Sequence, residues 1–314
     1  MKNISFIIPV YNAENTIEKT IRSILIQKCS NKIEVIAIDD KSNDKSVEII
    51  SKFKNVRLIT NKKNLGLAKS LNIAIKAAKN DLICIIWCDC VLKNNRWLHD
   101  IIVHSNGKNI AAITSKLIIP EEYWKKFSFW DRIVLTKDYN DSLEGRGTLR
   151  PTVFNKKILM NIGLYNEKEF RVAGEDTDLK WRIIERGYKI VNSKTEILHL
   201  HGFYNLSLRK QLFNKALPLA EAAGVNFAKH GIKSLPNRYW NHITSTFLYL
   251  TLFVPILNKI SLILIIALIL FYTLNVFKFT KDFKIIYVPF FKLIKDIISI
   301  IGFWKGFITG KQNF

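Results

Sequence analysis

The stretch that decides the fold is Asn80–Leu92, which reads NDLICIIWCDCVL. Leu82 to Trp87 is a short, almost wholly apolar run that is rich in isoleucine and follows the turn-forming pair Asn80-Asp81. Such a run predicts a strand that is buried on both faces, as in a parallel sheet. Asp89 follows at the carboxyl end of that strand, where ligands bind in open α/β sheets. Its carboxylate is placed either to hold a divalent cation beside a phosphate or to cap the next turn.

The residues before this stretch alternate between strand and helix patterns. Strands are predicted at Ile4–Val10, Ile33–Ile38 and Val56–Thr60, and helices at about 15–27, from Ser42 onward and at Leu67–Ala78. This alternation predicts a parallel sheet with right-handed crossovers. Because the carboxyl ends of parallel strands share one edge, we expect these residues to gather there: Tyr11, Asp39, Asp40, Gly66 and Asp89. The sequence has no G-x-G-x-x-G after the first strand and no G-x-x-x-x-G-K-[ST], so dinucleotide and P-loop sites are not expected.

The composition is apolar and strongly basic. Of the 314 residues, 48% are hydrophobic, which excludes a disordered chain, and 48 Lys and Arg against 26 Asp and Glu give a net charge of +22. Such a balance suits an anionic membrane surface or a nucleic acid. The basic residues are spread along the chain without a basic-aromatic stripe, so nucleic acid is not expected as a partner. The chain runs from Met1 directly into its first predicted strand, and no signal peptide is expected.

The cysteines, at positions 29, 84, 88 and 90, form no C-x-x-C pair and have no histidine at the spacing of a zinc site. We interpret them as reduced packing residues, which suits a cytosolic location.

Five segments, in order and at matching spacing, resemble the family 2 glycosyltransferases with the GT-A fold. They read PVYNAENTIEKTIRSILIQ, IEVIAIDDKSND, NLGLAKSLNIAIKAAKNDLICIIWCDC, VFNKKILMNIGLYNEKEFRVAGEDTDLKWRIIERGYKI and LHLHG, within about Ile4 to Phe203. The resemblance implies an α/β, Rossmann-like mixed sheet flanked by helices, followed by C-terminal transmembrane or amphipathic helices. It implies a glycosyltransferase domain over 1–235, divided into a nucleotide-binding half (1–92) and an acceptor half (93–235). A membrane hairpin and an interfacial helix would occupy 236–314.

The resemblance also implies roles for single residues. The nucleotide-binding positions are Pro9, Tyr11, Glu14, Asp39, Asp40, Gly66 and Lys69. Asp89 matches the last Asp of the D-x-D metal motif and would bind Mn²⁺ or Mg²⁺. Trp87 stands at the first position of that motif and cannot bind a cation, so a weakened metal dependence is expected. Asp176 matches the catalytic base of an inverting transfer, and Glu175 would position the acceptor or the base.

Three features of the acceptor half leave alternatives open. Pro120 to Gly147 is aromatic and charged, and forms either an acceptor-facing or membrane-facing flap or a packed helical insertion. Glu175 and Asp176 begin a helix that should end at Gly187. Acidic residues in the first turn of a helix suit the helix dipole, so a structural role is the alternative for this pair. His199 and His201 share one face of a strand and are either structural or contact a metal or diphosphate, with His201 preferred as the metal ligand.

The C-terminal part predicts attachment to a membrane. Two apolar limbs, Ile243–Leu257 and Ile260–Phe277, are interrupted near Asn258 and flanked by basic residues on both outer sides. This arrangement predicts a hairpin with both ends in the cytosol. A re-entrant hairpin and a buried pair of soluble helices are the alternatives. Ile285 to Phe307 predicts an amphipathic helix on an anionic inner leaflet, with a stripe of polar and small residues: Lys292, Lys295, Asp296, Ser299, Gly302 and Gly306.

We therefore expect a membrane-attached, cytoplasm-facing, inverting hexosyltransferase of polysaccharide biosynthesis. It would move a sugar from a nucleoside-diphosphate sugar to a hydroxyl of a lipid-linked or growing glycan. The Gln-x-x-Arg-Trp motif of processive synthases is absent, which favours a single addition. A catalytically weakened scaffold in a glycan assembly pathway is the alternative, suggested by Trp87. A nucleotidyltransferase is disfavoured because no glycine-rich loop follows the first strand.

Overall fold

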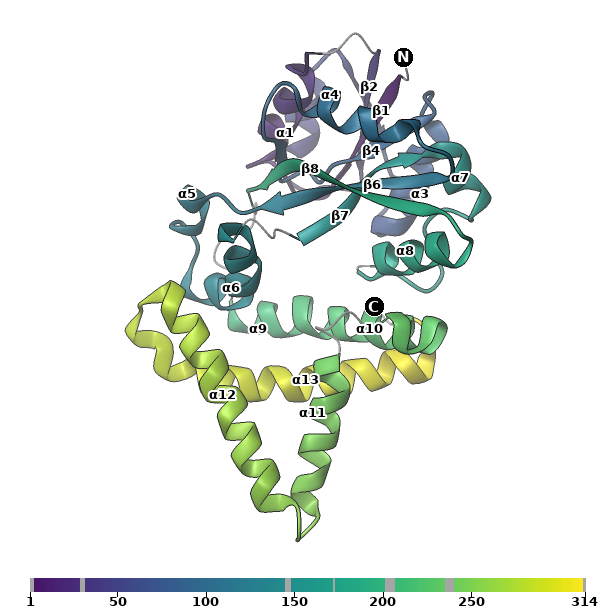
Figure 1. Cartoon of the computed structure of the whole chain (residues 1–314). Helices are drawn as coiled ribbons and strands as arrows, with labels where there is room; N and C mark the ends of the chain where they lie inside the picture. The colour runs from purple at the N-terminus through teal and green to yellow at the C-terminus, as the bar shows by residue number, and fades with distance from the viewer. Residues whose placement is uncertain are drawn as a thin grey trace. The chain divides into compact units, whose positions relative to one another are not determined.

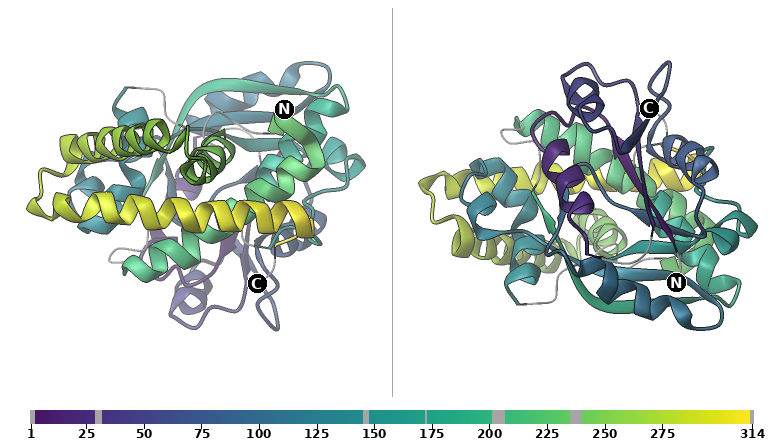
Figure 2. Two further views of the ribbon diagram at one scale, coloured as in Figure 1. Left: turned by 90° about the horizontal axis from the view of Figure 1, so that it is seen from below. Right: turned by 90° about the horizontal axis from the view of Figure 1, so that it is seen from above.

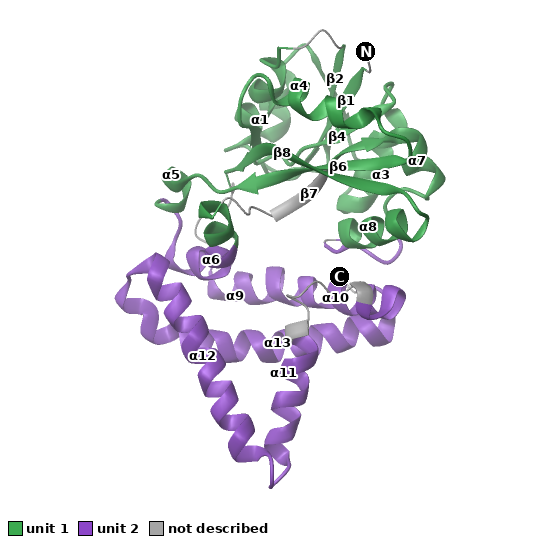
Figure 3. Ribbon diagram, viewed as in Figure 1, with its two compact units in different colours: residues 1–125, 138–167, 175–202 green, residues 126–137, 168–174, 203–314 purple. Residues whose placement is uncertain are grey.

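The computed structural model describes residues 3–28, 32–144, 148–171, 173–200, 207–234 and 240–312. The chain forms two compact units, which Figure 3 distinguishes by colour. Unit 1 comprises residues 1–125, 138–167 and 175–202, and unit 2 comprises residues 126–137, 168–174 and 203–314.

Unit 1 is built on an eight-stranded mixed sheet with the order β3-β2-β1-β4-β7-β6-β8-β5. The first four strands in this order are parallel to one another, as the sequence predicts. Strand β7 continues the sheet antiparallel to β4. The strands are β1 (Ile4–Val10), β2 (Ile33–Asp39), β3 (Val56–Thr60), β4 (Leu82–Ile85), β5 (Cys90–Leu92), β6 (Ile110–Ile118), β7 (Thr148–Asn155) and β8 (Lys189–His199).

Helices cover both faces of this sheet (Figure 1). One face carries α1 (Ile17–Leu25), α2 (Ser46–Ser51) and α4 (Trp97–Ile102), and the other carries α3 (Leu67–Ala77), α7 (Lys156–Asn161) and α8 (Glu175–Glu185). Side chains alternate across a strand, so Phe6 and Ile8 of β1 pack into the first core and Ile7 packs into the second. Burial of the central strands on both faces explains their continuous apolar sequence.

The deciding stretch differs from its prediction in one detail. Strand β4 ends at Ile85, before Trp87. The amide of Cys90 donates a hydrogen bond of 3.0 Å to the carbonyl of Trp87, which closes a turn over residues 87–90. This tight turn leads the chain directly into β5.

Within the segment from Pro120 to Gly147, the described residues 120–144 are largely helical, which supports the helical insertion. It contains α5 (Glu121–Trp124) and α6 (Phe129–Leu143). The short 3₁₀ helix η1 (Val103–Asn106) and strand β6 precede this segment. Trp124 stacks on Tyr139 with ring centroids 4.0 Å apart and planes within 3° of each other. Stacking of this kind buries a large apolar area and anchors α5 to the end of α6.

Unit 2 is helical. Its elements after the sheet are α9 (Leu208–Lys210), the π-helical turn η2 (Gln211–Ala216), α10 (Leu217–His230), η3 (Gly231–Ser234), α11 (Trp240–Leu250), η4 (Thr251–Phe253), α12 (Asn258–Thr280), η5 (Phe283–Tyr287) and α13 (Val288–Thr309). Helices α11 and α12 form a hairpin whose turn spans residues 254–257, and α13 passes the open end of this hairpin (Figures 1 and 2).

The hairpin agrees with the sequence in its arrangement and differs in the lengths of its limbs. Helix α11 ends at Leu250, earlier than the predicted limb. Among the described residues one helix, α12, is long and apolar enough to cross a membrane, judged by its 23 residues and composition. At about 1.5 Å per residue, a helix of this length spans the roughly 30 Å of a hydrocarbon core.

The small residues of α13 face another helix rather than solvent. A Cβ atom at Gly306 would lie 2.0 Å from the carbonyl oxygen of Glu221 on α10, and one at Gly302 would lie 2.9 Å from the side chain of Leu217. The predicted polar stripe is therefore wrong for these two glycines, because their lack of a side chain lets α10 approach closely. The exposed side of α13 is instead apolar and includes Phe290, Ile294, Ile297 and Ile301.

Candidate functional site

The two acidic residues after β2 hold loops at the carboxyl edge of the sheet. Asp39 is 1% exposed, and its carboxylate accepts hydrogen bonds from the amides of Lys41 and Ser42. Asp40 accepts hydrogen bonds from the amide of Leu65 at 2.7 Å and from that of Gly66 at 2.8 Å. Both carboxylates are engaged by backbone amides, so they shape the edge of the sheet.

The first predicted nucleotide loop is joined to the loop after β2. Pro9 lies in β1, and Tyr11 follows that strand with 46% of its surface exposed. The amide of Glu14 donates to Asp44 at 3.0 Å, and the carboxylate of Glu14 accepts from the amide of Lys45 at 3.1 Å. These reciprocal bonds fix the two loops against each other and leave the Tyr11 ring accessible.

The third predicted nucleotide contact begins helix α3. Gly66 precedes the helix with φ of 86°, a conformation that favours glycine, and its amide is held by Asp40. Lys69 lies in the first turn of α3 and is exposed. The structure thus places the predicted nucleotide-binding residues at the ends of β1 and β2 and at the start of α3.

A cluster of possible metal ligands forms where β5 pairs with β8. The register of this antiparallel pair places Cys90 opposite His199, and the Nε2 atom of His199 lies 3.2 Å from Oδ2 of Asp89. The ligand atoms of Asp89, Cys90 and His199 all lie within 4.8 Å of one another. Carboxylate, thiolate and imidazole groups are all ligands of divalent transition metals.

His199 contacts Asp89, and His201, the histidine preferred as a metal ligand from the sequence, lies outside the described residues. Cys90 packs in the core, as predicted, and pairing of two strands distant in sequence also places His199 opposite it. Cys84 and Cys88 do pack with the core, and burial raises the pKa of the Cys88 thiol to about 12.

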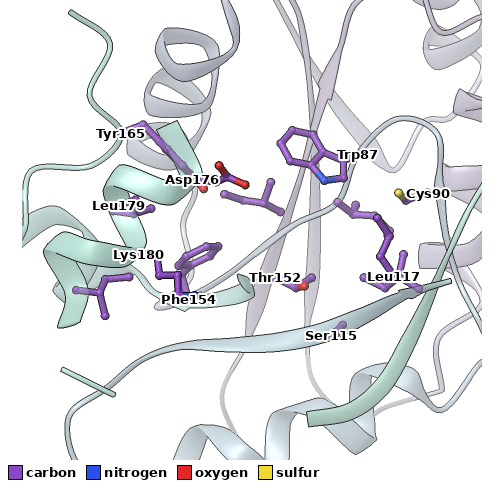
Figure 4. A pocket seen from close by; sticks show the side chains of 14 residues that line it. Trp87, Cys90, Ser115, Leu117, Thr152, Phe154, Tyr165, Asp176, Leu179 and Lys180 are labelled. Carbon is purple, nitrogen blue, oxygen red and sulfur yellow. The ribbon is translucent and has the colours of Figure 1, made fainter. Parts of the chain in front are cut away.

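Asp176 and Trp87 both line a pocket in unit 1 (Figure 4). Asp176 lies in the first turn of α8, where one of its oxygens accepts a hydrogen bond of 2.7 Å from the amide of Thr177. Glu175 precedes it and is 4% exposed. The pocket walls are mainly apolar, and its lining includes Ile85, Leu117, Phe154, Leu179, Ile183 and Ile197.

The pocket also contains residues that the sequence did not single out. Lys180 lies four residues after Asp176, and this helical spacing could have placed it on the same side of α8. Tyr165 lies at the pocket, and its burial, followed by the charges of Glu175 and Asp176, raises its pKa well above the ordinary value. A phenol with such a pKa stays protonated, and no local sequence pattern indicates its position.

Helix α8 itself forms as the sequence predicts. It begins at Glu175 and ends before Gly187, which has φ of 74° and whose amide donates to the carbonyl of Ile184. Arg182 joins this helix to the preceding loop, because its guanidinium contacts Asp178 at 2.8 Å and the carbonyl oxygens of Ile162 and Leu164.

Comparison with known sequences identifies relatives over the region that holds this site. Residues 5–149 match the family described as Glycosyl transferase family 2. An uncharacterised glycosyltransferase of Haemophilus influenzae is 30% identical over 177 residues, which cover 52% of this chain and 53% of that protein. The poly-beta-1,6-N-acetyl-D-glucosamine synthase of Staphylococcus aureus is 25% identical over 204 residues, 60% of this chain and 48% of that protein. The chain thus spans about half the length of these curated relatives.

A solved structure supports the fold across both units. A mannosyltransferase of Pyrobaculum calidifontis, determined in complex with GDP-Man and Mn²⁺, is similar with a TM-score of 0.63 at 15% sequence identity. The similarity covers 96% of this chain and 87% of that chain. This likeness and the mixed sheet with flanking helices identify the fold as GT-A. Over residues 5–149, the chain is similar to Glycosyl transferase family 2.

Proposed function

We propose that this protein is an inverting glycosyltransferase that moves a sugar from a nucleoside-diphosphate sugar to a hydroxyl group. The observation that carries the proposal is the pocket between Asp176 and Trp87, which Cys90 of the Asp89–Cys90–His199 cluster also lines. A carboxylate and a set of metal ligands thus lie in one unit, at the place where a reacting sugar and its diphosphate would have to bind.

The proposed chemistry is a single displacement with Asp176 as the general base. Its carboxylate takes the proton of the acceptor hydroxyl while the hydroxyl oxygen attacks the anomeric carbon. The bond from that carbon to the diphosphate oxygen breaks, and the nucleoside diphosphate leaves with the electron pair. Attack from the side opposite the leaving group inverts the anomeric configuration. Glu175 orients the acceptor or Asp176.

The proposed donor site uses Pro9, Tyr11, Glu14, Asp39, Asp40, Gly66 and Lys69. Tyr11 and Lys69 are exposed and would contact the nucleotide directly. Asp40 would act by holding the Gly66 loop, because its carboxylate is bound to the amides of Leu65 and Gly66. The neighbouring fold of Pyrobaculum calidifontis was determined with a nucleotide sugar, which supports this class of donor.

The residues of the cluster fit a divalent cation such as Mn²⁺ or Mg²⁺. Asp89 and His199 would hold it, and Cys90 offers a sulfur ligand beside them. Such a cation, when bound, would neutralise the negative charge that develops on the leaving diphosphate. Trp87 supplies no ligand, so diphosphate oxygens would have to complete the coordination.

The acceptor is proposed to be lipid-linked or a growing glycan, reached from the cytoplasmic side of a membrane. The support is the apolar surface of α12 and of the hairpin turn, where Phe253 is 85% and Ile256 is 86% exposed. Exposure of such side chains to water is unfavourable by about 25 cal/mol per Å² of apolar area. Residues 1–235 would carry the reaction, residues 236–314 the membrane attachment, and each encounter would add one sugar.

The test is turnover of a panel of nucleotide sugars by detergent-solubilised full-length protein, with and without Mn²⁺ or Mg²⁺. Asp89→Ala and Asp176→Asn are compared with wild type and with Asp100→Asn, a change at an exposed aspartate of α4. We expect one donor to be consumed by wild type and by Asp100→Asn, and turnover to fall at least about a hundredfold in the other two variants.

Two outcomes would contradict the proposal. Turnover that survives in Asp176→Asn would remove the proposed base. Folded protein that binds no nucleotide sugar would favour a non-catalytic scaffold, for which Trp87 at the metal motif would be the explanation.

A further inference from the structure

The seven residues before the Glu175-Asp176 pair belong to unit 2, although the pair itself belongs to unit 1. Residues 168–174 therefore lead from unit 2 directly into the first turn of α8. What fixes these residues also restricts where that turn begins, because Gly174 and Glu175 share a peptide bond. The hydrogen bonds, apolar packing and ion pair that hold this segment lie within unit 2.

Gln312, near the C-terminal end of the chain, binds the segment through both its backbone and its side chain. Its amide donates to the carbonyl of Glu169 at 2.9 Å, and its Oε1 accepts from the amides of Arg171 at 2.9 Å and Ala173 at 3.5 Å. Its Nε2 donates to the carbonyl of Pro218 on α10 at 2.9 Å. The side chain is 8% exposed, so it joins the segment to α10 in a largely water-free position.

Asn226 of α10 forms a second anchor at the last residue of the segment. Its Nδ2 donates to the carbonyl of Gly174 at 3.1 Å and to that of Ala222 at 3.0 Å. Gly174 has φ of 89°, and a Cβ atom there would lie 2.6 Å from the Cβ of Ala222. The backbone is thus pressed against α10 where only glycine fits.

Apolar and charged contacts complete the attachment. Phe170 is 1% exposed and packs with Ala222 and Val225 of α10. Lys229 of the same helix lies 2.9 Å from the carboxylate of Glu169. Five residues of the segment are therefore held by α10 and Gln312: Glu169, Phe170, Arg171, Ala173 and Gly174.

We propose that Gln312 and Asn226 are positioning residues for the catalytic turn. By fixing residues 168–174, they hold Asp176 at the distance and angle that proton transfer from the acceptor requires. The inference rests on the proposed role of Asp176. It also makes catalysis depend on helix α10 and on the residues that follow α13, both in unit 2.

The test compares steady-state kinetics of full-length Gln312→Ala, Gln312→Glu and Asn226→Asp in detergent with those of Thr309→Ala. Thr309 is exposed at the end of α13, and its hydroxyl bonds only to carbonyls of residues 305 and 311 among the contacts described. We expect Gln312→Ala and Asn226→Asp to lower kcat about tenfold or more with KM for the nucleotide sugar changed less than about twofold, since misplacement of reacting groups by about 1 Å can cost about a hundredfold.

Gln312→Glu separates the two halves of the contact. Its carboxylate still accepts from the amides of Arg171 and Ala173, but it cannot donate to the carbonyl of Pro218. We expect an intermediate kcat from this conservative variant. Thr309→Ala should match wild type in both constants.

Hydrogen exchange of the amides in 168–174 gives a readout that does not depend on the reaction. We expect faster exchange in Gln312→Ala and Asn226→Asp, with unchanged exchange in β1 and β2. The proposal would be overturned if amide exchange or kcat of Gln312→Ala matched wild type. A loss of nucleotide binding as large as the loss of kcat would also overturn it, because it would indicate general damage to the protein. If Asp176→Asn were active, the proposed base would be wrong. Amide exchange of residues 168–174 would still decide whether Gln312 holds this segment.

Discussion

The Nε2 atom of His199 lies 3.2 Å from Oδ2 of Asp89, although 110 residues separate the two in the chain. Pairing of β5 with β8 produces this contact and brings Cys90 to the same place. The three side chains offer possible metal ligands within 4.8 Å of one another.

His199→Ala is expected to weaken Mn²⁺ binding about tenfold to a hundredfold, because it removes a nitrogen ligand beside Asp89. The free Mn²⁺ in a titration, measured by electron paramagnetic resonance, gives the affinity. The matched control is His99→Ala, since His99 lies 3.1 Å from Asp100 in an exposed pair of the same kind. Equal affinities of wild type and His199→Ala would exclude this histidine as a ligand.

Cys90→Ser is expected to change which metal binds best. Sulfur is a softer ligand than oxygen, so the change should weaken Co²⁺ and Zn²⁺ binding about tenfold and leave Mn²⁺ binding within about twofold. Co²⁺ bound to a thiolate has a charge-transfer band in the near ultraviolet, which should vanish in this variant. Cys88→Ser should keep the band, because Cys88 does not belong to the Asp89–Cys90–His199 cluster. A band unchanged in Cys90→Ser would exclude the sulfur ligand.

Arg182→Met is expected to destabilise the protein by about 3–5 kcal/mol, because it removes a positively charged neighbour from the buried carboxylate of Asp178. Asp178 is fully buried, and Arg182 lies 2.8 Å from it. The comparison is Arg22→Met, which breaks an exposed pair with Glu18 and should cost less than about 1 kcal/mol. Thermal unfolding in detergent measures both. Similar unfolding temperatures for the two variants would refute the difference assigned to burial.

Gly306→Ala is expected to separate α13 from α10. The new Cβ would lie 2.0 Å from the carbonyl oxygen of Glu221, and crowding of this kind costs about 1–3 kcal/mol. Thermal unfolding should shift to lower temperature, whereas Thr309→Ala on the exposed end of α13 should leave it unchanged. Wild-type stability of Gly306→Ala would show that the two helices can separate without cost.

Acidic residues at the hairpin turn are expected to weaken membrane attachment. Phe253→Glu combined with Ile256→Glu places two carboxylates at side chains that are 85% and 86% exposed, at a cost of about 2.5–3.5 kcal/mol for each charge taken to the centre of a bilayer. Alkaline carbonate extraction of membranes should release more of this variant than of wild type. Val103→Glu, at an exposed apolar residue of unit 1, is the control. Equal retention of all three proteins would contradict insertion of the turn.

The sequence by itself determined the parallel half of the sheet, because local period and turn residues specify each strand and helix. The runs Ile4–Val10 and Leu82–Ile85 are buried at every position and apolar at all but Ser5, because both faces of the sheet are covered. The limits of α8 follow equally from Glu175 and Gly187, whose conformational preferences act within one helical turn. The apolar hairpin could be predicted for the same reason, because the composition of one continuous stretch of sequence indicates it.

Only the tertiary structure decided which distant side chains meet. Nothing near Cys90 in the sequence indicates that β8 will bring His199 beside it, because strand pairing across more than a hundred residues depends on the whole sheet. The glycines of α13 match a polar stripe by helical period, yet they contact α10, since period specifies a face and not its neighbour. The attachment of Gln312 to residues 168–174 likewise joins parts of the chain that no local pattern connects.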